Sequence, residues 1–91
     1  MTREQKIELC RIYNNSDIEC FEYLYQFCNE EQLELLDRLM TLNMETDIGW
    51  GREPATSEEM DEYYEGKWKL LGAFGLENDG GDAYFEGKFY E

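Results

Sequence analysis

The amino-acid sequence predicts a mainly α fold, a compact bundle of about four helices that forms a single acidic domain over residues 1–91. Three observations indicate this class. Apolar residues recur at spacings of three and four through most of the chain. Polar capping residues precede these apolar runs. Hydrophobic residues make up 42% of the sequence, including seven tyrosines, five phenylalanines and two tryptophans, which is too much apolar mass for a disordered acidic chain.

The first helix is expected over residues 3–13. Thr2 followed by Gln5 is a capping-box pattern, and the apolar positions after it have helical spacing. Asn14 and Asn15 end this helix, because asparagine favours turns and tolerates left-handed backbone.

A second helix is expected over residues 17–28, with Ser16 and Glu19 as a second capping box. Apolar residues cover most of its sides and leave only a narrow polar strip. This pattern predicts a helix that packs between other helices.

The third helix is expected over residues 30–43 and begins after Asn29. Leucines and a methionine mark its buried side, and acidic residues mark its outer side. Glu34 and Arg38 have the i, i+4 order that favours an ion pair within the helix.

Residues 44–56 are expected to form a loop, because they hold two glycines and the only proline and lack a helical period. Trp50 stands between Gly49 and Gly51. We expect its side chain to anchor the loop to the core, since tryptophan is highly buried on average. The alternative is an exposed contact residue.

The fourth helix is expected over residues 58–73. Thr56 or Ser57 caps it, and acidic residues occupy its first turn, where the helix dipole favours them. Gly66 is unfavourable within this helix, by about 1 kcal/mol relative to alanine.

Residues 74–91 are expected to form a turn and an aromatic tail, with the turn at residues 77–82. Residues 83–90 are rich in the aromatic residues typical of strands. An α+β fold is therefore the alternative, in which residues 67–74 form a strand and pair with residues 83–90 as a hairpin. The similarity between residues 63–68 and residues 84–89 favours that alternative.

The sequence predicts no enzyme, cofactor or metal site. It contains no histidine, which is the commonest general base and metal ligand. No glycine-rich phosphate-binding motif is present. Cys10, Cys20 and Cys28 have neither disulfide-framework nor zinc-binding spacing, so we expect them to be small core residues.

The net charge predicts the kind of partner. With 22 acidic and 8 basic residues the chain carries a formal charge of -14, which repels nucleic acid and anionic lipid and attracts surfaces rich in lysine and arginine. The longest apolar stretch, from Leu70 to Leu76, is too short to span a bilayer, and the N-terminus has no signal-peptide pattern. We therefore expect a cytoplasmic protein that binds a basic protein.

Acidic residues are densest at residues 58–65, where tyrosines are interleaved with them. A second acidic edge, from Glu30, Glu34 and Asp37 or from the tail, would bring this row closer to the phosphate density of a nucleic-acid strand. The competing interpretation is a solvated helix face. The candidate partner-binding residues are Glu58, Glu59, Asp61, Glu62, Glu65, Tyr63, Tyr64, Trp50, Asp79, Asp82 and Glu86.

In its size, acidity, lack of histidine and aromatic content, the whole chain resembles the nucleic-acid-mimicking phage proteins that block restriction or CRISPR effectors. This compositional resemblance implies a non-enzymatic inhibitor that occupies a basic groove meant for DNA or RNA and that acts in the host cytoplasm. The alternative function is an adaptor or regulatory module that binds through apolar and aromatic residues, with acidity serving solubility. A self-assembling structural protein is a third hypothesis.

Overall fold

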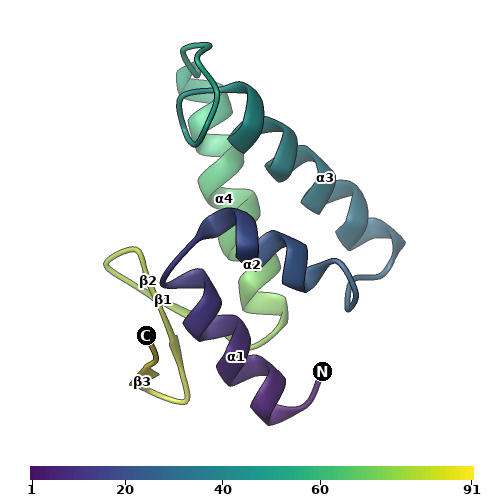
Figure 1. The fold of residues 1–91 in the computed structure, drawn as a ribbon, viewed down its shortest axis with the longest axis vertical. Coiled ribbons are helices and arrows are strands. Elements are labelled where there is room, and N and C mark those ends of the chain that lie inside the picture. The colour runs from purple at the N-terminus through teal and green to yellow at the C-terminus, as the bar shows by residue number, and fades with distance from the viewer.

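The computed structural model describes all 91 residues, and in it four helices are followed by a small antiparallel sheet (Figure 1). The mainly α class is confirmed. The helices are α1 (Arg3–Tyr13), α2 (Asp17–Leu24), α3 (Glu30–Glu45) and α4 (Ser57–Ala73). The strands are β1 (Glu77–Asp79), β2 (Asp82–Phe85) and β3 (Lys88–Phe89), paired in that order. No helix is both long and apolar enough to cross a membrane.

The helices begin at their capping residues. Complete capping boxes open α1 at Thr2, α3 at Asn29 and α4 at Thr56. At α2, the Ser16 hydroxyl accepts the Glu19 N–H, but the Glu19 carboxylate makes no return bond because the Ser16 N–H donates to the Ile12 carbonyl at 2.9 Å. The second half of the capping box predicted there is therefore wrong.

The predicted end of α2 is also wrong, since the helix stops at Leu24 rather than at residue 28. Residues 25–27 form a turn in which the Phe27 N–H donates to the Leu24 carbonyl. Asn29 must adopt an extended backbone, with ψ of 179°, to cap α3. The chain leaves the helical conformation before that point because α3 begins so soon after α2.

Helices α3 and α4 lie side by side and run in opposite directions (Figure 1). Gly66 of α4 lies at this contact, since a Cβ there would come within 3.0 Å of the Leu35 side chain and 3.1 Å of the Leu39 side chain. The absence of a side chain at Gly66 thus lets the two helices approach closely.

The C-terminal hairpin forms within residues 77–89, so the alternative pairing of residues 67–74 with 83–90 is wrong. Residues 67–73 belong to α4. Gly80 and Gly81 both have positive φ, at 65° and 92°, and join β1 directly to β2. A glycine turn inside the tail lets it supply both strands of the hairpin itself.

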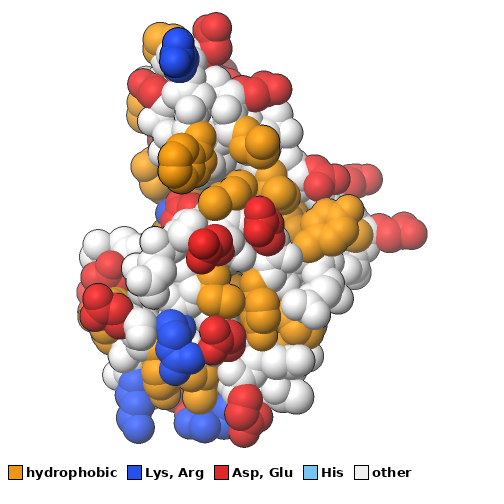
Figure 2. Space-filling view, viewed as in Figure 1, with side chains coloured by type: hydrophobic (Ala, Val, Ile, Leu, Met, Phe, Trp, Pro, Cys, Tyr) orange, Lys and Arg blue, Asp and Glu red, His pale blue; other side chains and the backbone are white.

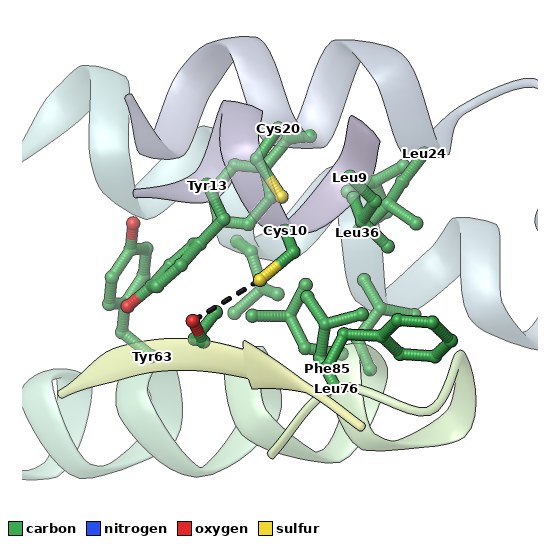
Figure 3. Close-up of a cluster of buried hydrophobic side chains, with 14 of the residues drawn as sticks. Leu9, Cys10, Tyr13, Cys20, Leu24, Leu36, Tyr63, Leu76 and Phe85 are labelled. Atoms are coloured by element: carbon green, nitrogen blue, oxygen red, sulfur yellow. Dashed lines mark hydrogen bonds between the residues drawn. The ribbon is translucent and has the colours of Figure 1, made fainter. Parts of the chain in front are cut away.

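The sheet packs on α1 through both polar and apolar contacts. The Asn14 side chain accepts the Ala83 N–H and donates to the carbonyls of Ala83 and Tyr90. Leu76 and Phe85 belong to the same buried cluster as the α1 residues Leu9 and Cys10 (Figure 3). The Cys10 thiol donates to the Ala83 carbonyl at 3.2 Å.

The core also contains the cysteines, as predicted. Cys10 and Cys20 are fully buried, and Cys28 is half-buried against the core. Burial raises the pKa of the Cys20 thiol well above its ordinary value. Cys20 therefore remains a neutral thiol at physiological pH.

Candidate acidic interaction surface

The charge is distributed unevenly over the fold. Helices α3 and α4 carry ten of the 22 acidic residues but only three basic residues, Arg38, Lys67 and Lys69. Lys67 is 5% exposed and contributes little to the surface. Figure 2 shows Lys and Arg side chains gathered mainly at the lower end, where α1 and the sheet lie in Figure 1, whereas Asp and Glu side chains are spread over much of the remaining surface.

Nine of these ten acidic residues are exposed, and we call them the α3–α4 acidic face. On α4 the acidic residues are three and four positions apart, which places them on one side of the helix. Arg38 of α3 bridges to this side by pairing with Glu62, so the exposed sides of the two helices adjoin. The α3–α4 acidic face consists of Glu30, Glu31, Glu34, Asp37, Glu45, Glu58, Asp61, Glu62 and Glu65.

Most carboxylates of this face have no ion-pair partner. Only four of the 22 acidic residues form ion pairs, and on the face only Glu62 does so. The Arg38 guanidinium donates to both Glu62 carboxylate oxygens, at 2.9 and 3.0 Å, and this hydrogen bonding lowers the pKa of Glu62. The predicted Glu34–Arg38 pair is wrong, because Arg38 reaches across to α4 instead. Eight carboxylates of the face therefore remain unpaired.

The predicted acidic residues of α4 differ in their environments. Glu58, Asp61 and Glu65 are exposed and unpaired. The Glu59 carboxylate is half-buried and accepts the Thr56 N–H at 3.0 Å, so it caps the helix. Three of the five acidic residues are thus fully available to a partner.

Tyr63 is not available, and its prediction as a contact residue is wrong. Its ring is fully buried, because it faces the core from the side of α4 opposite to the acidic residues. The hydroxyl donates to the Asp17 carboxylate at 2.8 Å and accepts the Asn43 amide N–H at 3.1 Å. Burial raises the pKa of Tyr63 well above its ordinary value. Tyr64, by contrast, is 50% exposed.

The candidate residues of the tail lie on the sheet, away from the contact between α3 and α4. Asp79 and Asp82 are exposed on either side of the glycine turn, and the Tyr13 hydroxyl of α1 donates to Gly81 in that turn at 2.9 Å. Glu86 pairs with Arg3 of α1 at 3.0 Å, and this hydrogen bonding lowers the pKa of Glu86. The structure therefore places the α4 acidic residues beside those of α3 and the tail residues beside α1.

Trp50 is 79% exposed, so its prediction as a core anchor is wrong. The loop is held by its backbone instead. The Trp50 N–H donates to the Asn43 carbonyl at 2.8 Å, and the Gly51 N–H donates to the Thr46 carbonyl at 2.9 Å. These bonds fold the loop onto the end of α3 and leave the indole in solvent.

Sequence reasoning missed Lys67, which lies at the centre of an aromatic cluster. Its Nζ is 4.9 to 5.7 Å from the centroids of four rings and 3.6 Å from the Asp17 carboxylate. Helical spacing could have indicated that Lys67 is buried, since it lies four residues from both Tyr63 and Leu71 in the apolar stripe of α4. The four rings are those of Tyr13, Tyr63, Tyr64 and Trp68.

A shallow groove of about 500 Å³ lies between the first half of α3 and the last half of α4. Leu35, Leu70 and Ala73 form its apolar lining, and Glu31 and Lys69 are among its charged residues. No group of three or more cysteine or acidic side chains in the structure is arranged to hold a metal ion.

Comparisons of this chain with protein-family models, with curated proteins and with solved structures find no match. The function is therefore inferred from the charge and exposure of its own surface residues.

Proposed function

We propose that this protein is a non-enzymatic inhibitor that binds a basic, nucleic-acid-binding protein through the α3–α4 acidic face and competes with nucleic acid for it. A CRISPR or restriction effector is the kind of target that the composition suggests. One observation carries the proposal: eight unpaired carboxylates lie exposed on two adjacent helices. Carboxylates left without partners within the molecule can accept hydrogen bonds from the lysine and arginine side chains of another.

The spacing of the charges supports competition with nucleic acid. Carboxylates three or four residues apart on one helix lie about 5–6 Å from one another. One DNA strand carries a phosphate for about every 3.4 Å of helix axis, so a single helix is too sparsely charged to imitate it. Two adjacent helices raise the charge density of the face, and the Arg38–Glu62 pair links them at the surface.

The charge of the whole molecule supports the same function. A net charge of -14 raises the rate at which the protein meets a basic partner, and dissolved salt screens this attraction. We therefore expect binding that is fast at low salt and weakened strongly as salt rises.

Competition for a captured partner tests the proposal. Proteins retained from a cell lysate at low salt are identified by mass spectrometry, and displacement of labelled DNA or RNA from the retained protein is then measured. The variant Glu58→Gln/Asp61→Asn/Glu65→Gln should compete about tenfold or more weakly, because each exposed charge pair is worth up to about 1 kcal/mol.

The matched control is Glu22→Gln/Glu77→Gln/Glu91→Gln, which removes the same charge from exposed positions outside the face. It should compete nearly as well as the unmodified protein. Equal loss in both variants would show that only the net charge matters, and retained binding in high salt would contradict the proposal.

The second candidate function is an adaptor that binds through apolar residues. The exposure of Met60 and Tyr64, one turn apart on α4, favours it. In that case Tyr64→Ala should abolish capture of the partner, while the triple amide variant of the acidic face should leave capture unchanged.

A further inference from the structure

The loop between α3 and α4 presents Trp50 to solvent. Its side chain has the highest exposed fraction of the large hydrophobic residues, 79%, and Met44 nearby on α3 is 60% exposed. Tryptophan is enriched among the residues that contribute most to protein interfaces. An exposed indole offers apolar area whose burial by a partner is favourable.

The loop is well ordered by hydrogen bonds even though Trp50 is exposed. The Asp47 N–H donates to the Glu53 carbonyl at 2.9 Å and closes the base of the loop, while the Trp50 N–H bond to Asn43 holds its tip. A Cβ at Gly51 would overlap the carbonyl group of Glu45, so the backbone lies directly against α3. The backbone of a loop fixed in this way loses little conformational freedom on binding.

The surroundings of Trp50 are acidic. Glu45, Asp47 and Glu53 are all exposed, and Arg52 is the only basic residue of the loop. Figure 2 shows hydrophobic, acidic and basic side chains together at the end of the molecule where Figure 1 places this loop. A second copy of the chain would bring another charge of -14, so self-association through this end is opposed. The charge complementarity therefore favours a cationic occupant.

We infer that Trp50 receives an arginine side chain of the basic partner, an inference that rests on the proposed function and specifies its chemistry. A guanidinium group stacks on an indole face, and its N–H groups donate to neighbouring carboxylates at the same time. Lysine lacks the planar group that does both. The occupant is thus arginine in preference to lysine.

Titration with oligo-arginine and oligo-lysine peptides of equal length tests this inference. Trp68→Phe leaves Trp50 as the only tryptophan, so its fluorescence reports contact at the loop. Oligo-arginine should bind up to about fivefold more tightly than oligo-lysine, because lysine also makes a cation–π contact but lacks the planar group that stacks on the indole, and binding should change the Trp50 emission. Calorimetric titration with Trp68 retained provides the same comparison without that substitution.

Two variants at position 50 distinguish an aromatic contact with arginine from the simple burial of apolar area. Trp50→Leu should remove the extra preference for arginine, whereas Trp50→Tyr should keep part of it. An unchanged preference in Trp50→Leu would overturn the inference alone. If each peptide binds the Glu58→Gln/Asp61→Asn/Glu65→Gln variant as tightly as it binds the unmodified protein, the proposed function is overturned instead. If neither peptide binds at low salt, both are overturned.

Discussion

At the scale of single residues, Lys67 shows how a charged side chain becomes part of a core. Its ammonium group lies among four aromatic rings and beside Asp17, and the Tyr63 hydroxyl donates to the same carboxylate. The aliphatic stem of lysine packs against apolar neighbours while its charge is balanced. Lys67 thereby connects α4 to α1 and α2.

Replacing Lys67 should destabilise the fold much more than replacing its exposed neighbour. Lys67→Ala removes the cation from the rings and leaves Asp17 without its ion pair, so we expect a loss of about 2–3 kcal/mol in the free energy of unfolding. Lys69→Ala on the same helix should change it by less than about 0.5 kcal/mol. Urea unfolding followed by circular dichroism measures both, and equal effects would show that the aromatic cluster contributes nothing.

At the scale of secondary-structure elements, two glycines have opposite roles. Gly51 lets the loop lie against the end of α3, whereas Gly72 lies exposed in the last turn of α4 with nothing within 4 Å of a Cβ placed there. The first is required by close backbone approach, and the second only weakens a helix.

Alanine at these two positions should therefore change stability in opposite directions. Gly51→Ala should destabilise the protein by about 1–3 kcal/mol, because the loop must move away from α3 to admit the methyl group. Gly72→Ala should stabilise it by about 0.4–1 kcal/mol by restricting the unfolded chain. Thermal unfolding compares the two variants, and a stable Gly51→Ala protein would contradict the tight packing of the loop.

At the scale of the whole molecule, ionisable groups in the core limit stability at high pH. Burial raises the pKa values of Tyr13, Cys20 and Tyr63 above their ordinary values. These groups remain protonated in the folded state at pH values where the unfolded chain has already lost their protons. Their contribution is fully present below about pH 9, the ordinary value of the cysteine thiol, and declines as pH rises.

The free energy of unfolding should consequently fall above about pH 9, by up to about 1.4 kcal/mol per pH unit for each group that ionises only on unfolding. Tyr63→Phe removes one such group, so its slope above about pH 10 should be shallower even if its stability at neutral pH is lower. Urea unfolding at constant ionic strength measures the slopes. Identical slopes would show that Tyr63 does not remain protonated in the folded protein.

The amino-acid sequence by itself determined the features that depend on neighbours within three or four residues. Helix starts are local, because Thr2 and Asn29 bond to backbone groups three positions away. The acidity and the absence of histidine are properties of composition. These features were sufficient to predict the helical class and an acidic row on α4.

Only the tertiary structure decided what depends on segments far apart in the chain. Arg38 pairs with Glu62 of α4 rather than with Glu34, and Tyr63 faces the core while its neighbour Tyr64 is half exposed. Trp50 is exposed because the loop's backbone bonds to α3, which no local pattern indicates. Short-range spacing marks the apolar side of a helix, but packing between distant elements selects the partner of each residue and decides which of these side chains are buried.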